Sequence, residues 1–344
     1  MRRLNILTWH VHGSYLNTLA RVEHNWYLPV KPGRPEGYIG RGTTFDLPAS
    51  VYEVPSEEVH HLDLDLILYQ SSRHYFEDQL EILSPRQREL PRIYLEHNTP
   101  RPHASDTRHP VDDPHTLLVH VTPYNRLMWD NGQTPTTVIE HSVALDPGVY
   151  YQGNLARGLT MVNCMQKRPR IVGLDLFQQA RAALPLDIVG MQTEELGGLG
   201  DIPYRDLHKR VAEYRFLFSP IRYTSLPLAV VEAMTIGMPV VALATTELPS
   251  VIENGKNGYI SCDIGELLDY MLRLLNEPAE ARRLGEQARE TARRRFGLKR
   301  FIDDWNNAFA CAQSLHRWHA RNSAYSGEGE AQCTSMREKR EQLL

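Results

Sequence analysis

The stretch of the chain with the clearest chemical pattern is residues 224–242, TSLPLAVVEAMTIGMPVVA. The loop that ends at Ser225 opens a predicted helix, and the free N–H groups at the start of a helix form an anion site. Gly237 and Pro239 end this helix, and residues 240–242 have the character of a buried strand. Glu232 lies two turns into the helix. The segment predicts an anion site with a carboxylate nearby, although a plain helix, turn and strand with Glu232 facing solvent fits the same pattern.

A basic loop forms the second candidate site. Lys167, Arg168 and Arg170 lie between a predicted strand at 159–164 and a predicted helix at 174–183. Three cations in four residues suit phosphate, because guanidinium groups match its oxygens with paired hydrogen bonds. The residues do not distinguish which cation binds, and a solvated basic turn is the alternative.

Two further candidate sites follow predicted strands. Residues 4–9 lead into His12, Gly13 and Ser14, and the first strand of an open parallel sheet ends at the ligand crevice. The segment has no Gly-x-Gly-x-x-Gly fingerprint, which argues against a nicotinamide cofactor. His97 follows a strand at 92–95, where a hydrogen-bonded surface histidine is the alternative. His120 and His141 are weaker candidates at other strand ends.

The elements that position these residues repeat as strand and helix. Near-continuous apolar strands between helical patterns indicate buried parallel sheets covered on both faces. We expect two Rossmann-like α/β domains, residues 1–150 and 151–296, joined near 146–154, with a helix over 297–322 and a polar tail over 323–344. The predicted strands are 4–9, 62–69, 92–95, 116–121, 136–139, 159–164, 186–189, 214–219, 239–243 and 258–261, and the predicted helices are 174–183, 204–213, 228–236, 264–276 and 279–295.

Composition excludes several classes of protein. A formal net charge of −4 argues against a protein that works by neutralising nucleic-acid phosphates. No apolar run approaches the roughly 20 residues of a membrane span. The four cysteines have no paired spacing, which suits a reducing, cytoplasmic compartment. The histidines lack the cysteine partners or helical pair spacing of a zinc site, so we expect no metal.

Residues 214–262 resemble the donor-binding region of glycosyltransferase family 4, which has the GT-B fold. The family pattern is a glutamate, seven residues, then Glu-Ala-Met, a Gly-x-Pro-Val-Val turn and a later Asn-Gly turn. Here Glu232, Gly237 and Asn257 begin the corresponding parts. The resemblance implies two Rossmann-like domains facing each other across a cleft, with a C-terminal helix that crosses back to the first domain.

The resemblance also implies roles for individual residues. Glu232 would bind the ribose hydroxyls, and Ser225 and Leu226 would offer backbone N–H groups to the donor phosphate. Thr224 stands where the family has its first, sugar-contacting glutamate. His97 would face the donor sugar. The basic loop (Lys167, Arg168, Arg170) would bind the diphosphate. In the first loop, Gly13 and Ser14 would contact the donor, and His12 and Ser14 the acceptor. Ile202 and Tyr204 would contact the nucleotide base.

The expected activity is transfer of a sugar from a nucleotide-diphosphate donor to a hydroxyl of a glycan, lipid-linked or small-molecule acceptor, as in polysaccharide biosynthesis. The family usually retains the anomeric configuration, and its basic loop replaces a metal cofactor. The alternatives are a nucleotide-sugar-binding GT-B protein without turnover, suggested by Thr224, and a GT-B sugar-nucleotide epimerase, which the basic loop and the Glu-Ala-Met segment disfavour. The basic segment 282–300 suggests peripheral membrane contact, with a solvated helix face as the alternative.

Overall fold

The first half of the chain builds one parallel sheet of seven strands. The computed structural model describes the backbone of residues 2–341 and the side chains of residues 2–322. The strand order is β3-β2-β1-β4-β5-β6-β7, which begins as the doubly wound order of dinucleotide-binding folds. The strands are β1 (Asn5–Thr8), β2 (Asn25–Val30), β3 (Val51–Pro55), β4 (Leu66–Tyr69), β5 (Arg92–Glu96), β6 (Thr116–His120) and β7 (Thr136–Val138).

Alternate residues of these strands face two separate cores. Ile6 belongs to the core under α1 (Gly13–Leu19), whereas its neighbour Leu7 faces the opposite core, as the two-residue period of a strand requires. Short helices between β3 and β5 pack on this second core, and one more short helix, α4, follows β6. They are η1 (Ser56–His61), η2 (His74–Asp78), α2 (Gln79–Ile82), α3 (Pro85–Arg88) and α4 (Pro123–Met128).

The second half forms a parallel sheet of five strands in the order β12-β11-β10-β8-β9. Helices cover both faces, with α8 and α11 on one core and α6 and α10 on the other. The strands are β8 (Leu155–Met161), β9 (Leu186–Val189), β10 (Tyr214–Ser219), β11 (Val240–Leu243) and β12 (Tyr259–Ser261). The helices are η3 (Met165–Lys167), α5 (Pro169–Val172), α6 (Leu174–Ala183), η4 (Glu194–Leu196), α7 (Tyr204–Val211), α8 (Leu228–Ile236), α9 (Leu248–Val251), α10 (Ile264–Asn276) and α11 (Pro278–Arg295).

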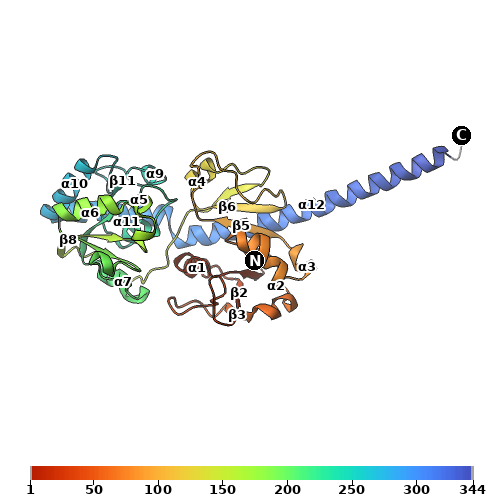
Figure 1. Cartoon of the computed structure of the whole chain (residues 1–344), viewed down its shortest axis with the longest axis horizontal. Helices are drawn as coiled ribbons and strands as arrows, with labels where there is room; N and C mark the ends of the chain where they lie inside the picture. Colours follow the sequence, from red (N-terminus) through yellow and green to blue (C-terminus); the bar gives the residue numbers. More distant parts are fainter. Residues whose placement is uncertain (1, 342–344) are drawn as a thin grey trace.

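A long helix, α12 (Leu298–Glu341), leaves the second domain and lies along the first (Figure 1). Phe301, Trp305 and Phe309 recur on one face of it and are fully buried in the core of the first domain. The expected α/β fold with a returning helix is therefore confirmed. The helix continues to Glu341, so it extends past residue 322, where the sequence analysis ended it and placed a polar tail.

The strands of the second sheet, β1 and the strands from β4 to β7 were predicted to within a few residues, but no strand was predicted at β2 or β3. Both of these pair in parallel on the far side of β1. The segment between β2 and β3, residues 31–50, contains no helix or strand, and it extends toward the second domain through Phe45. The domain boundaries themselves stay predictions.

Candidate functional site

Two loops of the second sheet meet where the direction of its connections reverses. β8 and β10 are neighbours in the sheet although β9 separates them in the chain. In open parallel sheets, ligands bind outside the carboxyl ends of the strands at such a reversal. The loop after β8 carries the basic residues, and the loop after β10, residues 220–227, leads into α8. The topology therefore brings the two strongest sequence motifs to one edge of the sheet.

Glu232 lies on the buried side of α8, with only 5% of its surface exposed. Its Oε1 accepts a hydrogen bond from the Tyr204 hydroxyl at 3.4 Å, and its Oε2 lies 3.5 Å from His208 Nε2. Tyr204 and His208 are one turn apart on α7, so they share a helix face. Burial and the nearby carboxylate of Glu232 raise the pKa of Tyr204, so its hydroxyl keeps its proton. Among the residues whose side chains are described, no Lys or Arg pairs with Glu232.

An aromatic contact joins the two domains beside Glu232. The Phe45 ring of the 31–50 segment lies 4.6 Å, centroid to centroid, from the Tyr204 ring. A Cβ added to Gly13 would stand within 2.4 Å of Phe45 Cε2. Gly13 was predicted to let a ligand approach the backbone, and in this structure its lack of a side chain makes room for Phe45. Ile202 packs at the edge of the second-domain core that contains residues of α8 and α11.

The loop before α8 touches the first domain directly. Ser225 Oγ donates a hydrogen bond to the His97 carbonyl oxygen at 2.9 Å, and the Tyr223 hydroxyl donates to the Pro100 carbonyl oxygen at 3.0 Å. Thr224, between them, is half-buried, and Leu226 is buried in the core of the second domain. Residues 223–225 and 97–100 therefore lie against each other where the two domains meet.

The basic loop separates into paired and unpaired cations. Arg170 lies 2.7 Å from Asp175, and Arg222 binds the same carboxylate at 2.6 and 2.8 Å. The hydrogen bonds from Arg222 lower the pKa of Asp175 to about 2, so it is a carboxylate at neutral pH. Lys167 and Arg168 are exposed and form no ion pair with any side chain that the structure describes.

His97 is held in a defined tautomer. Gln70, directly after β4, donates through Nε2 to the Trp9 carbonyl oxygen and to Thr8 Oγ1, both at 3.0 Å. Its Oε1 therefore faces His97 Nε2, also at 3.0 Å, and this nitrogen carries the proton. Burial, and then the neighbouring histidines, lower the pKa of His97 well below its usual value. The ring is neutral, with Nδ1 left as a hydrogen-bond acceptor.

His12 forms the outer edge of this cluster. Its ring meets the His97 ring edge to face at 4.2 Å between centroids. The side chain is exposed to solvent on one side and faces protein on the other. Desolvation lowers the pKa of His12, and the carboxylates of Glu96 and Glu36 partly oppose this effect. Ser14 follows in the first turn of α1 and is half-buried.

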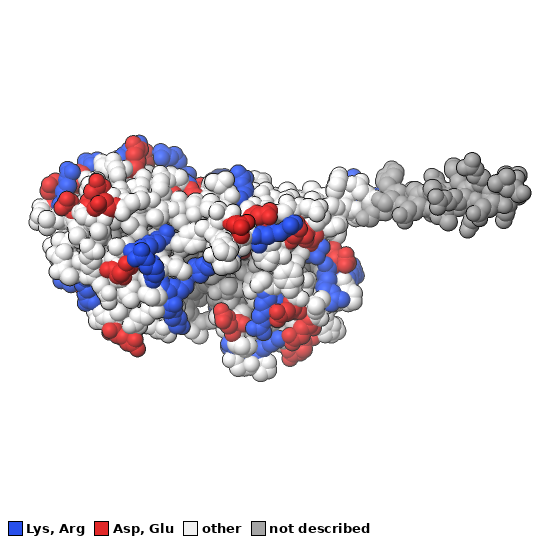
Figure 2. Space-filling view, turned by 45° about the horizontal axis from the view of Figure 1, so that its top comes forward, with Lys and Arg blue, Asp and Glu red and all other residues white. Residues whose placement is uncertain are grey.

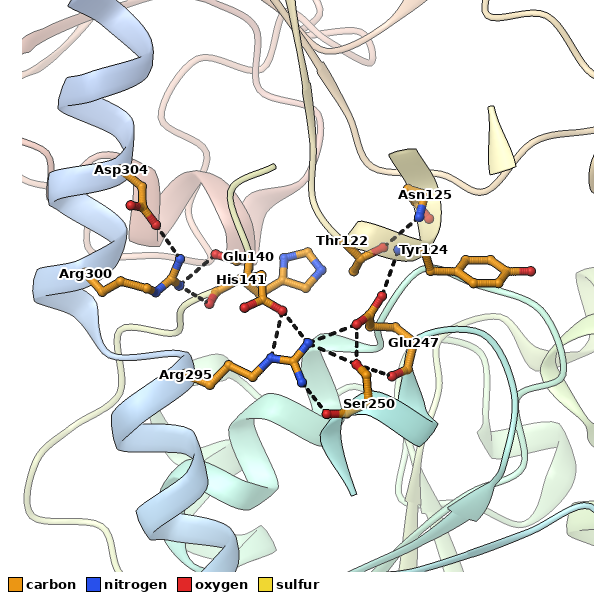
Figure 3. A network of polar contacts seen from close by, with 10 residues as sticks. All are labelled: Thr122, Tyr124, Asn125, Glu140, His141, Glu247, Ser250, Arg295, Arg300 and Asp304. Carbon is orange, nitrogen blue, oxygen red and sulfur yellow. Dashed lines mark hydrogen bonds and ion pairs between the residues drawn. The ribbon is translucent and has the colours of Figure 1, made fainter. Parts of the chain in front are cut away.

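A hollow lies between the two domains. Figure 2 shows this hollow, with basic side chains gathered next to it on the domain at the left, which is the second domain in Figure 1. A polar network joins the domains nearby (Figure 3). Arg295 pairs with Glu140 of the first domain and with Glu247 of the second, and Glu247 accepts a hydrogen bond from Tyr124 N–H at 2.9 Å.

Most cations of the basic segment 282–300 lie on the exposed side of its helices. Several of these cations form ion pairs: Arg283 with Glu280, Lys299 with Asp303 and Arg300 with Asp304.

Within the described part of the chain, no helix is long and apolar enough to cross a bilayer, and no three His, Cys, Asp or Glu side chains gather as metal ligands would. The expectation of metal-independent chemistry stays a prediction.

Three residues of the site were missed by the sequence analysis. His208 could have been found, because it lies four residues after Tyr204 on a predicted helix. Gln70 directly follows the predicted strand 62–69, which lies next to β1 where the first sheet reverses its own order. Phe45 gives no local signal, because its contact is with a residue of the other domain.

Part of the chain is similar to known proteins. Residues 192–291 match the model of the family described as glycosyl transferases group 1. A segment of 104 residues is 31% identical to a poly(ribitol-phosphate) alpha-N-acetylglucosaminyltransferase of Staphylococcus aureus (strain COL), covering 29% of this chain and 21% of that protein. The curated relatives are thus matched over only about a fifth of their length.

The fold has known counterparts over almost the whole chain. Sucrose-phosphate synthase (tll1590) from Thermosynechococcus elongatus superposes with a TM-score of 0.66 at 16% identity, covering 90% of this chain and 98% of that one. Anabaena Alr3699/HepE in complex with UDP-glucose superposes with a TM-score of 0.62 at 13% identity, covering 90% and 100%. The two-domain architecture is the GT-B fold.

Proposed function

We propose that this protein is a glycosyltransferase that moves a sugar from a nucleotide-diphosphate donor to an acceptor hydroxyl, because residues 192–291 match the model of the glycosyl transferases group 1 family. The observation that carries the proposal is the buried Glu232 carboxylate on α8, which accepts a hydrogen bond from the Tyr204 hydroxyl and has no Lys or Arg partner among the described side chains. A carboxylate in this state can accept hydrogen bonds from both hydroxyls of a ribose.

The diphosphate would lie between the basic loop and α8. Lys167 and Arg168 have their charges free for phosphate, whereas the guanidinium of Arg170 is occupied by Asp175. The first N–H groups of α8, after Leu226, add a positive field at the other side of the same edge. Together they would stabilise the nucleoside diphosphate as it leaves, which is the role that a metal ion has in other transferases.

The transferred sugar would lie against the first domain. His97, neutral and with Nδ1 as an acceptor, can receive a hydrogen bond from a sugar hydroxyl and orient the ring. His12, Gly13 and Ser14 follow β1; Gly13 and Ser14 would meet the donor, and His12 and Ser14 the acceptor. With the acceptor hydroxyl attacking from the face that the diphosphate leaves, its proton can pass to a leaving phosphate oxygen, and the anomeric configuration is retained.

Tyr204 and Ile202 would border the nucleoside. The Tyr204 hydroxyl donates to the carboxylate that would bind the ribose, so donor binding requires this hydrogen bond to be shared or exchanged. Phe45 holds the Tyr204 ring from the other domain. The base contacts are therefore made where the two domains close on each other.

Thr224 supports a second candidate, a nucleotide-sugar-binding protein without turnover. A threonine hydroxyl at this position cannot replace the charge of the glutamate that the family pattern places there. Binding of a donor with no sugar transfer to any of a panel of hydroxyl acceptors would favour this candidate. A transfer rate that rises in Thr224→Glu would instead identify this position as a limit on an existing activity.

The test is a calorimetric titration with UDP and uridine, followed by an assay of UDP release from UDP-N-acetylglucosamine. We expect Glu232→Gln to weaken binding of both ligands by about 1–3 kcal/mol, or roughly 5- to 150-fold, because one hydrogen-bonded charge is lost. Glu253→Gln, an exposed residue paired with Lys256, is the matched control and should leave binding unchanged. Equal affinities in wild type and Glu232→Gln would remove Glu232 from the site.

A further inference from the structure

A second cavity lies at the junction of the domains, outside the site described above. It is an open pocket of about 470 Å³, lined by Arg21 after α1, by linker residues between 143 and 149, by the end of α8, by Arg289 of α11 and by Leu298 at the start of α12. The cleft lies at the first residues of α1 and α8, whereas the cavity lies at their last turns. Helices of seven and nine residues place it about 10–13 Å from the cleft.

Two arginines from different domains line this cavity. Arg21 follows α1, and its contacts are long hydrogen bonds to Asn17 Oδ1 at 3.5 Å and to the Asp46 carbonyl oxygen at 3.4 Å. Arg289 lies in α11, with its guanidinium 4.1 Å from the centre of the Tyr150 ring. Neither forms an ion pair with a described side chain, whereas Arg283, Arg295 and Arg300 of α11 and α12 do.

Arg289 also has an unused donor. Its Nε–H is buried and has no hydrogen-bond partner in the described structure. A buried donor without a partner costs free energy unless something in its surroundings accepts the proton. The carboxylate that lines the cavity, Asp146, is engaged by the Gly148 N–H at 2.9 Å in its own turn. Asp146 keeps its negative charge in that turn, but the lining holds two arginines against this one carboxylate, so the cavity is net positive.

The rest of the lining is apolar and includes Val143, Leu145, Val149, Ile236 and Leu298. A cavity of this size accommodates a small organic molecule rather than a single ion. We propose that it binds a small organic anion, a phosphate or carboxylate on a compact apolar or sugar-sized body, whose charge lies between Arg21 and Arg289. Such a ligand would connect the two domains behind the cleft, and this site is separate from the donor site of the proposed function.

The test uses phenyl phosphate, which carries a phosphate on an apolar ring, with inorganic phosphate and phenol as comparisons. We expect phenyl phosphate to bind the full chain at least tenfold more tightly than either comparison ligand, because it uses both the charge and the apolar wall. Arg289→Gln should weaken this binding at least fivefold. Arg294→Gln, an exposed cation on another face of α11, should leave it unchanged.

A second variant keeps the test decisive if Arg289→Gln does not fold. Leu298 is exposed at the first residue of α12, where a carboxylate favours the helix. Leu298→Glu should therefore fold normally and still weaken phenyl phosphate binding at least fivefold by repulsion. Three results would overturn the proposal: no binding to the wild type, no change in Leu298→Glu, or loss of binding in Lys167→Gln, which would place the ligand at the basic loop of the donor site.

Discussion

The backbone N–H of Tyr124 donates a hydrogen bond to Glu247 Oε2 at 2.9 Å, so a carboxylate of the second domain binds the first turn of a helix in the first domain (Figure 3). The same carboxylate pairs with Arg295 at 2.9 Å, and Arg295 Nε donates to Glu140 at 2.8 Å. Glu247 is almost fully buried. These residues form a polar connection between the domains beside the cleft.

Removing this carboxylate should loosen the domain contact. Glu247→Ala leaves the Tyr124 N–H without its partner and Arg295 with one carboxylate in place of two, so we expect a loss of about 2 kcal/mol in the free energy of unfolding. Urea denaturation measures it. Glu253→Ala breaks an exposed ion pair and should cost less than about 0.5 kcal/mol. Similar losses in the two variants would show that the connection adds no stability.

The basic loop should act through two of its three cations. We expect Lys167→Ala and Arg168→Ala each to weaken UDP binding about tenfold while leaving uridine binding unchanged, because a charge-assisted hydrogen bond contributes about 1.5–3 kcal/mol. Arg170→Ala should change UDP binding less than twofold, since Asp175 already holds its guanidinium. Calorimetry with both ligands separates these cases. A loss for uridine as large as for UDP would contradict a phosphate role.

Stability should fall as the pH is lowered from 7.5 to 5.5. Burial lowers the pKa values of His74, His120 and His141 to about 4, below the 6.5 of an exposed histidine. Below pH 6.5 these histidines are therefore protonated in the unfolded chain but not in the folded protein. The loss of stability grows as the pH falls, until the pH reaches the pKa values of the folded protein. Each histidine should contribute about 1 kcal/mol of this loss per pH unit.

Urea denaturation at pH 7.5, 6.5 and 5.5 measures this dependence. His141→Asn should reduce the slope by the share of one histidine, whatever its effect on stability at pH 7.5. An unfolding free energy that is constant over this range would contradict the neutral state of these buried rings. So would an unchanged slope in His141→Asn.

The chain order of the fold was largely readable from the sequence, because buried parallel strands are continuous apolar runs. The exceptions are β2 and β3. β2 contains Pro29, and a proline argues against a strand in the middle of a sheet. Pro29 is tolerated near the end of β2, where it pairs in register with Val54 of β3. β3 is short, and two of its five residues are exposed, so its apolar pattern is weak.

The candidate site was predictable where its chemistry is local in sequence. The helix start before Glu232 and the cations of the basic loop are readable because their spacing within one segment carries the pattern. Pairs that form across the fold were not readable, namely Phe45 with Tyr204 and Gln70 with His97. The pairing of Arg170 with Asp175 was also missed, although it distinguishes this cation from its neighbours.

The returning helix has a consequence for how the chain acquires its structure during synthesis. Phe301, Trp305 and Phe309 complete the core of the first domain, yet they are made about 160 residues after its last strand, β7. At translation rates of roughly 5–20 residues per second, the first domain waits on the order of ten seconds or more with this apolar surface uncovered. Its final packing follows that of the second domain, so the half of the protein that emerges first is the last to become native.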